Sequence, residues 1–173
     1  EPLADFIDFF SLGEGEESTV EIVECYRTAK KEHWSKARFL KAVSAIEGVY
    51  VPSFYEHSYN PDGTIAAITP LEGAPQTVRK RIVQNMDTAY WPEKQIVPST
   101  EIVHDRSNLE VFRGCIRGCR FCQAGFCYRP VRSKSADALY AQAVQSLEDS
   151  GHSEITMASL STSDYKYLPE LAD

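Results

Sequence analysis

The hydrophobic pattern at the start of the chain predicts a strand followed by a helix. Residues 5–12 (DFIDFFSL) form a nearly continuous apolar run rich in aromatics, which predicts a buried strand of a parallel sheet. The run ends in a glycine-punctuated turn, and Ser18 followed by Glu21 has the spacing of a capping box, so we expect a helix from Ser18 to about Lys31. The positions expected on its inner side are Val20, Val23, Tyr26 and Arg27.

A second helix and a hairpin are predicted next. Helical spacing of four apolar side chains predicts a helix from Ser35 to about Ile46, with Gly48 as its stop. These side chains are Phe39, Leu40, Val43 and Ile46. Residues 49–59 and 64–70 have the composition of two short strands, and the Pro-Asp-Gly sequence between them favours a turn.

The last third of the chain has the pattern of a β-α-β unit. Residues 108–114 (NLEVFRG) predict a strand that delivers a cysteine at its C-terminal end. We expect Ser135 to cap a helix that runs to about Asp149, with Gly151 just beyond its end. Residues 153–160 (SEITMASL) predict the next strand, so a parallel α/β sheet or barrel is expected to begin at about residue 105.

These elements predict an α/β protein in three parts. We expect residues 1–34 to be the C-terminal end of an α/β domain and residues 35–104 to be a mixed linking module that contains the β-hairpin. Residues 105–173 are expected to be the first β-α-β of a truncated sheet or barrel. Because the chain starts inside a predicted strand and lacks an initiator Met, we expect it to be a fragment of a longer protein.

Composition and charge narrow the class of protein. The chain is 43% apolar and 25% charged, which is ordinary for a globular protein, and its apolar runs are too short for a membrane span. A net charge of −7 argues against a general nucleic-acid binder. Seven basic residues nevertheless lie between His104 and Lys134, around the cysteines. Clustered cysteines do not form a spaced disulfide framework, so we expect a cytoplasmic protein.

Three of the five cysteines form one motif, C-x3-C-x2-C, made by Cys115, Cys119 and Cys122. Structural zinc usually takes two separated pairs of ligands, and the sequence offers no distant second pair. A redox dithiol would use Cys119 and Cys122 but leave Cys115 unexplained. An iron–sulfur cluster with four cysteine ligands would recruit Cys127. The fourth interpretation is a 4Fe-4S cluster held by three cysteines, with one iron open to a substrate or cofactor.

The motif resembles the signature of the radical S-adenosylmethionine (SAM) enzymes. The resemblance implies that Cys115, Cys119 and Cys122 hold a 4Fe-4S cluster, whose fourth iron binds the amino and carboxylate groups of SAM. It also implies that Phe121 occupies the aromatic position whose backbone borders the adenine. The expected activity is reductive cleavage of SAM to a 5′-deoxyadenosyl radical, with an electron donor such as flavodoxin or ferredoxin as partner.

A wider resemblance covers nearly the whole chain. Residues 98–132, the later segment SLSTSDY and the turn SLGEGEE (11–17) are similar to an uncharacterised bacterial radical SAM family with a cobalamin-binding-like N-terminal domain. This resemblance implies a Rossmann-like tail of a cobalamin-binding-type domain in residues 1–34 and a partial (β/α)6 barrel from about residue 105. A cobalamin signature is absent from this chain, and its site would lie upstream of residue 1.

The sequence departs from the superfamily pattern after the second barrel strand. The usual Gly-Gly-Glu, which binds the amino group of SAM, is replaced by SLST, so Ser159, Ser161 and Thr162 are assigned that role. Arg129 and Arg132 follow the cysteine loop and are expected to contact the SAM carboxylate or the anionic face of the cluster. Cys127 is interpreted as a packed thiol, since a fourth ligand would close the open iron.

Several functions therefore stay open. The main hypothesis is a radical SAM enzyme of unknown substrate and unknown catalytic residues, in which cobalamin bound upstream would favour methyl transfer to an unactivated carbon. The first alternative is methylthiolation or another modification of tRNA or a similar macromolecule, favoured only weakly by the basic region around the cysteines. The second is a non-catalytic iron–sulfur or zinc-binding module with Cys127 as fourth ligand.

Overall fold

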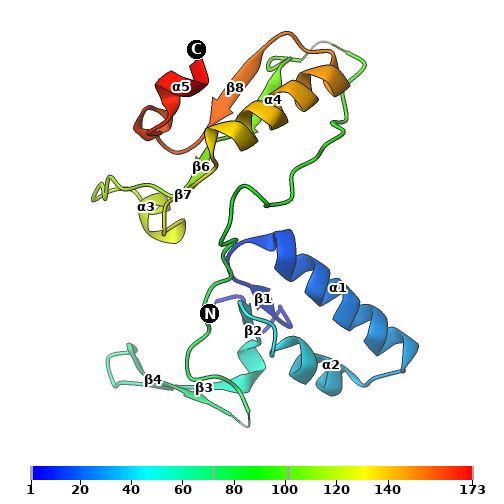
Figure 1. The fold of residues 1–173 in the computed structure, drawn as a ribbon. Coiled ribbons are helices and arrows are strands. Elements are labelled where there is room, and N and C mark those ends of the chain that lie inside the picture. Colours follow the sequence, from blue (N-terminus) through cyan, green and yellow to red (C-terminus); the bar gives the residue numbers. More distant parts are fainter. Residues whose placement is uncertain (1, 72, 101, 173) are drawn as a thin grey trace. The chain divides into compact units, whose positions relative to one another are not determined.

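The computed structural model describes residues 2–71, 73–100 and 102–172, shown as a ribbon in Figure 1. The chain divides into two compact units, residues 1–83 and residues 84–173, which are described separately. Within the described residues, the strands form short two-stranded sheets among helices, so the mixed α/β class is confirmed. The predicted boundaries at residues 34 and 104 stay predictions.

Two helices and a short antiparallel ladder make up the core of the first unit. Helix α1 spans Gly15–Lys31 and helix α2 spans Lys36–Val43. Strand β1 (Phe10–Ser11) pairs with β2 (Val49–Tyr50). The buried side chains between these elements are Leu40, Val43, Val49 and Val51, with Ile22, Cys25 and Phe39 packed against them.

The predicted strand over residues 5–12 is wrong in length and direction. Only Phe10 and Ser11 are extended in a ladder, and they pair antiparallel with β2. Charged side chains interrupt the apolar run, because the Asp8 carboxylate lies exposed and forms an ion pair with Lys36 Nζ at 2.6 Å. The phenyl ring of Phe6 is 85% exposed, so this part of the run is not in the core.

Helix α1 begins three residues before the predicted cap. Ser18 is inside the helix, where its hydroxyl donates to the Glu14 carbonyl oxygen at 2.9 Å. Glu14 precedes the first helical residue, and its carboxylate accepts from the Val83 backbone N–H at 2.6 Å. Its own N–H donates to the Arg81 carbonyl at 2.9 Å, so residues distant in sequence fix the start of the helix.

The inner face of α1 also differs from the prediction. Val20 and Val23 are 61% and 47% exposed, and Tyr26 is exposed as well. The side chains turned toward the core are Ser18, Ile22, Cys25 and Ala29. These four follow the i, i+4, i+7, i+11 spacing of one helical stripe, a stripe that is apolar only in part and therefore hard to find in the sequence.

Helix α2 and the hairpin agree with the sequence. Ser35 caps α2, since its hydroxyl oxygen accepts from the Arg38 N–H at 3.3 Å, and the helix ends at Val43, slightly before the predicted end. After a 3-10 turn η1 (Pro52–Phe54), strand β3 (Tyr55–Tyr59) pairs antiparallel with β4 (Ile65–Pro70). The connecting turn is held by the Asp62 carboxylate, which accepts from the Thr64 N–H and hydroxyl.

The second unit contains the predicted β-α-β. Strand β5 (Ser107–Glu110) runs parallel to β8 (Ile155–Ala158), and helix α4 (Ala136–Ser150) connects them (Figure 1). The register pairs Leu109 with Met157. The buried side chains of this unit are Leu109, Val111, Phe112, Leu139 and Tyr165.

The ends of α4 lie where the sequence predicts them. The Ser135 hydroxyl oxygen accepts from the Ala138 N–H at 3.2 Å, which satisfies one of the free donors of the first turn. The Ser135 N–H in turn donates to the Asp87 carboxylate at 2.6 Å. Gly151 ends the helix in the left-handed conformation at φ 73°, where its N–H donates to the Leu147 carbonyl at 2.9 Å.

Short elements between β5 and α4 and after β8 complete the second unit. Strands β6 (Phe112–Arg113) and β7 (Arg132–Ser133) pair antiparallel, and α3 (Ala124–Cys127) lies in the loop between them. A 3-10 turn η2 (Thr162–Asp164) and helix α5 (Leu168–Ala172) follow β8. Among the described residues, no helix has both the length and the apolar character needed to cross a membrane.

Tyr165 connects the chain after η2 to the loop before α4. Its ring lies in the core, and its hydroxyl donates to the Lys134 carbonyl oxygen at 2.9 Å. The Lys134 side chain is also buried, and its Nζ donates to Gln142 Oε1 at 2.7 Å. Burial lowers the pKa of this lysine, because the interior disfavours its charged form.

We predict that Tyr165→Phe lowers the free energy of opening of α4 by about 1 kcal/mol, because the ring is kept while the buried Lys134 carbonyl loses its hydrogen-bond donor. Native-state hydrogen exchange of the α4 amides measures this change. Tyr167→Phe is the matched control. The centres of the Tyr167 and Tyr165 rings are 5.7 Å apart, and the substitution keeps this ring contact. Equal effects of the two variants would contradict the assigned role of the Tyr165 hydroxyl.

Candidate functional site

Two loops of the second unit meet because of the parallel strands. The cysteine loop follows β5 and β6, and the serine-rich loop 159–162 follows β8. Since β5 and β8 run parallel, the segments after their C-terminal ends emerge at the same edge of the sheet. This edge carries most of the site residues predicted from the sequence.

The cysteine loop is closed at its base. Phe112 pairs with Ser133 and Arg113 with Arg132, so the chain enters and leaves the loop as neighbouring strands. Gly114 follows at φ 92°, a left-handed conformation that favours glycine. A Cβ on Gly114 would lie 2.8 Å from the Tyr128 carbonyl oxygen and 2.9 Å from the Pro130 carbonyl oxygen, so the returning backbone passes directly over it.

The three motif cysteines lie in the first half of this loop as thiols. Cys115 and Cys122 are half-buried and Cys119 is exposed. The Arg117 N–H donates to Cys115 Sγ at 3.5 Å, and the Cys122 N–H donates to the Cys119 carbonyl oxygen at 3.1 Å. Both contacts are short-range, so the loop turns tightly around the positions of the motif.

The donor set suits an iron–sulfur cluster in kind. Cysteine thiolates are the usual ligands of such clusters, and three of them come from one short, accessible loop. The geometry is not that of an assembled site: across residues 2–71, 73–100 and 102–172, no three His, Cys, Asp or Glu side chains converge as metal ligands. The 4Fe-4S cluster on Cys115, Cys119 and Cys122 stays a prediction.

Cys127 lies on the same loop, at the end of α3, and is exposed. The expectation of a packed thiol is therefore wrong in its burial. Helix α3 is only four residues long, so it has too little surface to cover the side chain at its end. Cys25, in contrast, packs against the core of the first unit.

An arginine inside the cysteine motif reaches the segment after β8. Arg117 Nε donates to Asp164 Oδ2 at 2.9 Å, and Arg117 Nη2 donates to Asp164 Oδ1. This bidentate ion pair lowers the pKa of the Asp164 carboxyl and raises the pKa of the Arg117 guanidinium.

The serine-rich loop is ordered by its own hydroxyl groups. Ser159 Oγ and Thr162 Oγ1 share a hydrogen bond of 2.8 Å, and the Ser161 hydroxyl bonds the Asp164 carboxylate, which further lowers its pKa. A small cavity of about 40 Å³ separates this loop from the cysteine loop. Its lining residues are Phe112, Cys115, Ile116, Val131, Ser133, Ser161 and Asp164.

The other predicted residues do not line the small cavity between the two loops. Phe121 is 92% exposed, so its ring contacts little of the protein. Arg129 is exposed and its guanidinium lies 5.1 Å from the centre of the Phe126 ring, within the same loop. Arg132 belongs to β7, and its Nε donates to the Pro130 carbonyl at 3.2 Å, so it lies at the base of the loop.

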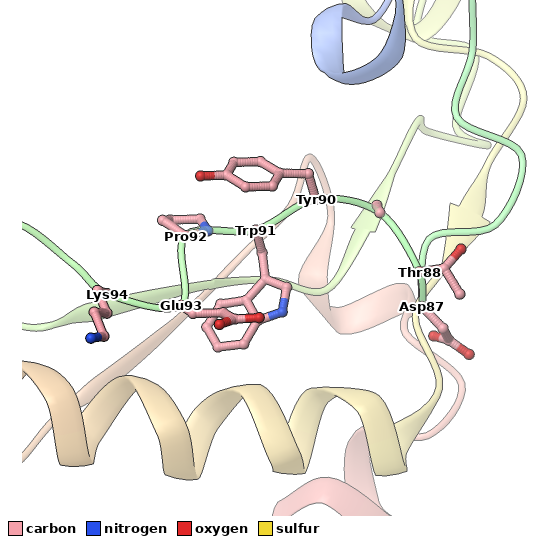
Figure 2. A pocket seen from close by; sticks show the side chains of 8 residues that line it. Asp87, Thr88, Tyr90, Trp91, Pro92, Glu93 and Lys94 are labelled. Atoms are coloured by element: carbon pink, nitrogen blue, oxygen red, sulfur yellow. The ribbon is translucent and has the colours of Figure 1, made fainter. Parts of the chain in front are cut away.

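A larger hollow of about 550 Å³ lies along residues 87–94 and contains none of the predicted site residues. Figure 2 shows the Trp91 ring directed toward α4, with the Tyr90 ring on the opposite side of the segment. Trp91 also borders a cavity of about 230 Å³ whose walls include the buried Lys134. These hollows lie beside α4, whereas the cysteine loop follows β6.

Asp164 and Gly114 belong to the site but were not predicted from the sequence. Asp164 had a signal, since it follows a run of serines and threonines just after a predicted strand, where polar residues gather at the edge of a parallel sheet. Gly114 had a weaker one, because a glycine between a strand and a cysteine is consistent with many kinds of turn.

Comparison with known proteins bears on the class of the chain. Residues 1–52 match the family of radical SAM proteins, N-terminal region, which supports membership of the radical SAM superfamily. The chain is also similar to the uncharacterized protein MJ0966 of Methanocaldococcus jannaschii, with 28% identity over 176 residues. That alignment covers 99% of this chain and 31% of the relative, so the chain spans less than a third of the relative's length. No solved structure matches the chain significantly.

We predict that Gly114→Ala opens the base of the cysteine loop, because its Cβ would collide with backbone atoms and its φ is unfavourable for alanine. The expected cost is about 2 kcal/mol, seen as faster hydrogen exchange of the amides in β6 and β7. Gly125→Ala is the control within the same loop, since a Cβ there would meet no atom within 4 Å. Unchanged exchange in Gly114→Ala would show that the close approach does not hold the loop.

Proposed function

We propose that this chain is part of a radical SAM enzyme that cleaves SAM reductively to start radical chemistry. The observation that carries the proposal is the C-x3-C-x2-C motif on a closed loop at the C-terminal end of a parallel strand. The match of residues 1–52 to the N-terminal region of radical SAM proteins supports it independently, because those residues do not include the cysteines. A partial (β/α)6 barrel and a Rossmann-like tail of a cobalamin-binding-type domain are part of the same proposal.

In this proposal Cys115, Cys119 and Cys122 hold a 4Fe-4S cluster, which supplies the electron for SAM cleavage when bound. The three cysteines belong to one loop whose base is closed by the pairing of β6 with β7. The Arg117 backbone N–H donates to Cys115 Sγ and would stabilise negative charge on that sulfur. Arg129 and Arg132 would offset part of that charge.

The chain's polar residues would bind the amino acid part of SAM. Ser159, Ser161 and Thr162 offer hydroxyl and carbonyl oxygens that accept hydrogen bonds from an ammonium group. Ser161 already borders the small cavity together with Cys115, which supports this assignment. The backbone of the exposed Phe121 would border the adenine.

Arg129 and Arg132 would contact the SAM carboxylate or the anionic face of the cluster. Arg129 is the better placed of the two, since it is exposed and belongs to the loop that carries the cysteines. Arg132 lies at the base of the loop, where its hydrogen bond to Pro130 favours a role in holding the returning chain. A guanidinium suits either role, because its planar donors match a carboxylate.

The reaction that follows radical formation is proposed only by class. Cobalamin bound by a preceding domain would favour methyl transfer to an unactivated carbon, and flavodoxin or ferredoxin would supply the electron. Modification of tRNA or another macromolecule is the alternative, and the basic residues around the cysteines support it. The whole protein's substrate and partners belong to this proposal as well.

One observation favours a second candidate, a non-catalytic iron–sulfur or zinc module. Cys127 is exposed on the same loop as the other three cysteines, so a fourth thiolate is within the same structural unit. Four cysteine ligands would complete a closed site and leave no position for SAM.

Anaerobic reconstitution with iron and sulfide separates the two candidates. We expect Cys115→Ser, Cys119→Ser and Cys122→Ser each to lose most of the bound iron and sulfide, because each removes one of three ligands. Cys127→Ala is expected to keep the cluster, and the EPR spectrum of its reduced form is expected to change on addition of SAM. Cys25→Ala is the control, since Cys25 packs in the core of the other unit.

Loss of the cluster in Cys127→Ala would refute the three-cysteine site and favour the closed module. A cluster that persists in Cys127→Ala but shows no spectral response to SAM would refute the proposed activity.

A further inference from the structure

An ion pair joins Arg117 of the cysteine loop to Asp164, which lies two residues after the serine-rich loop. Arg117 lies between the first two cysteines of the motif, and Asp164 is the last residue of η2. The two residues are 47 positions apart in sequence, so their contact is purely tertiary. The contact is bidentate: Nε and Nη2 of the guanidinium each donate to a different carboxylate oxygen.

Both partners are tied to the residues on their own side. The Arg117 N–H donates to Cys115 Sγ, so the residue that carries the guanidinium also borders the first thiol. The Asp164 carboxylate accepts from the Ser161 hydroxyl, and both residues line the small cavity together with Cys115. A continuous set of contacts therefore runs from Cys115 through Arg117 and Asp164 to Ser161.

The pair fixes an arrangement more than it adds stability. The Arg117 side chain is 57% exposed, and solvent-exposed ion pairs contribute little to the free energy of unfolding. Its planar donors nevertheless define both the distance and the orientation of the carboxylate, which a single contact would not. Asp164 is the more buried partner, at 18% exposed, so its carboxylate is the more restrained of the two groups.

We infer that Arg117 and Asp164 are positioning residues that dock the cysteine loop onto the loop proposed to bind the SAM amino group. The inference rests on the proposed function. Without the pair, the three cysteines stay on one closed loop, and the segment after β8 keeps its anchor at Tyr165 but loses its direct side-chain link to the cysteine motif. Breaking the pair should therefore weaken SAM binding and leave cluster loading intact.

The experiment uses the full-length protein with the substitutions Arg117→Ala, Asp164→Asn and the two combined. Arg120→Ala is the matched control, since Arg120 is an exposed arginine of the same motif. The first readout is hydrogen exchange of residues 115–119 in the protein without cluster. The second is the SAM concentration that half-saturates the change in the EPR spectrum of the reconstituted protein, with iron and sulfide content measured in parallel.

We expect both single variants to exchange faster at residues 115–119 and to need about tenfold more SAM, with iron and sulfide content as in the parent. The double variant should match the single ones, because either substitution alone already removes the whole ion pair. Arg120→Ala should resemble the parent in both readouts. Rescue of exchange protection by Asp164→Glu, compared with Asp164→Asn, would support the ion pair.

Two results would overturn the inference: unchanged exchange and SAM dependence in Arg117→Ala, or single effects that simply add in the double variant. A parent protein whose spectrum ignores SAM refutes the proposed function by itself. In that case the exchange readout decides whether the pair docks the two loops, and protection equal to that of the parent in Asp164→Asn would overturn the docking as well.

Discussion

The parallel ladder between β5 and β8 is the constraint on which the second unit depends. Two strands that run the same way need a crossover, and α4 provides it while covering the ladder with Leu139. The same direction sends both following loops to one edge of the sheet. The cysteines and the serine-rich segment can therefore meet at that edge although about 40 residues lie between them. Tyr165 then returns the chain to the start of α4 and keeps the second loop in place.

Much of the fold could be predicted because its signals are local. Ser135 and Gly151 mark the ends of α4 through contacts within one turn, and Ser35 does the same for α2. Helix α1 could not be bounded this way. Its start is set by Glu14, which contacts Val83 and Arg81 far along the chain, and a capping pattern at Ser18 does not contain that information. Residues 5–12 illustrate a related difficulty. Asp8 forms an exposed ion pair with Lys36 of α2, and only Phe10 and Ser11 of this segment belong to a strand.

The chemistry of the candidate site is a prediction from the sequence, whereas its geometry depends on contacts between residues far apart in the chain. The cysteine spacing predicts a cofactor-binding loop from the sequence alone, because few other uses require three thiols so close together. Its link to Asp164 depends on where the crossover brings a second loop, which no local pattern encodes. The burial of Cys127 was misjudged for a similar reason, since a one-turn helix offers no surface to cover it.

The returning backbone passes so close to Gly114 that the cysteine loop is a closed ring. The close approach of residues 128–131 to Gly114 is the neck of this ring. The neck is set by three backbone atoms within 3 Å of the position of an added Cβ, and none of them depends on the side chains inside the ring. Residues can then be inserted or exchanged at the far side of the ring at a small entropic cost, which grows only slowly with its length. Related proteins with this neck would be free to change the circumference of the ring, and with it the surroundings of the cysteines, without altering the sheet beneath.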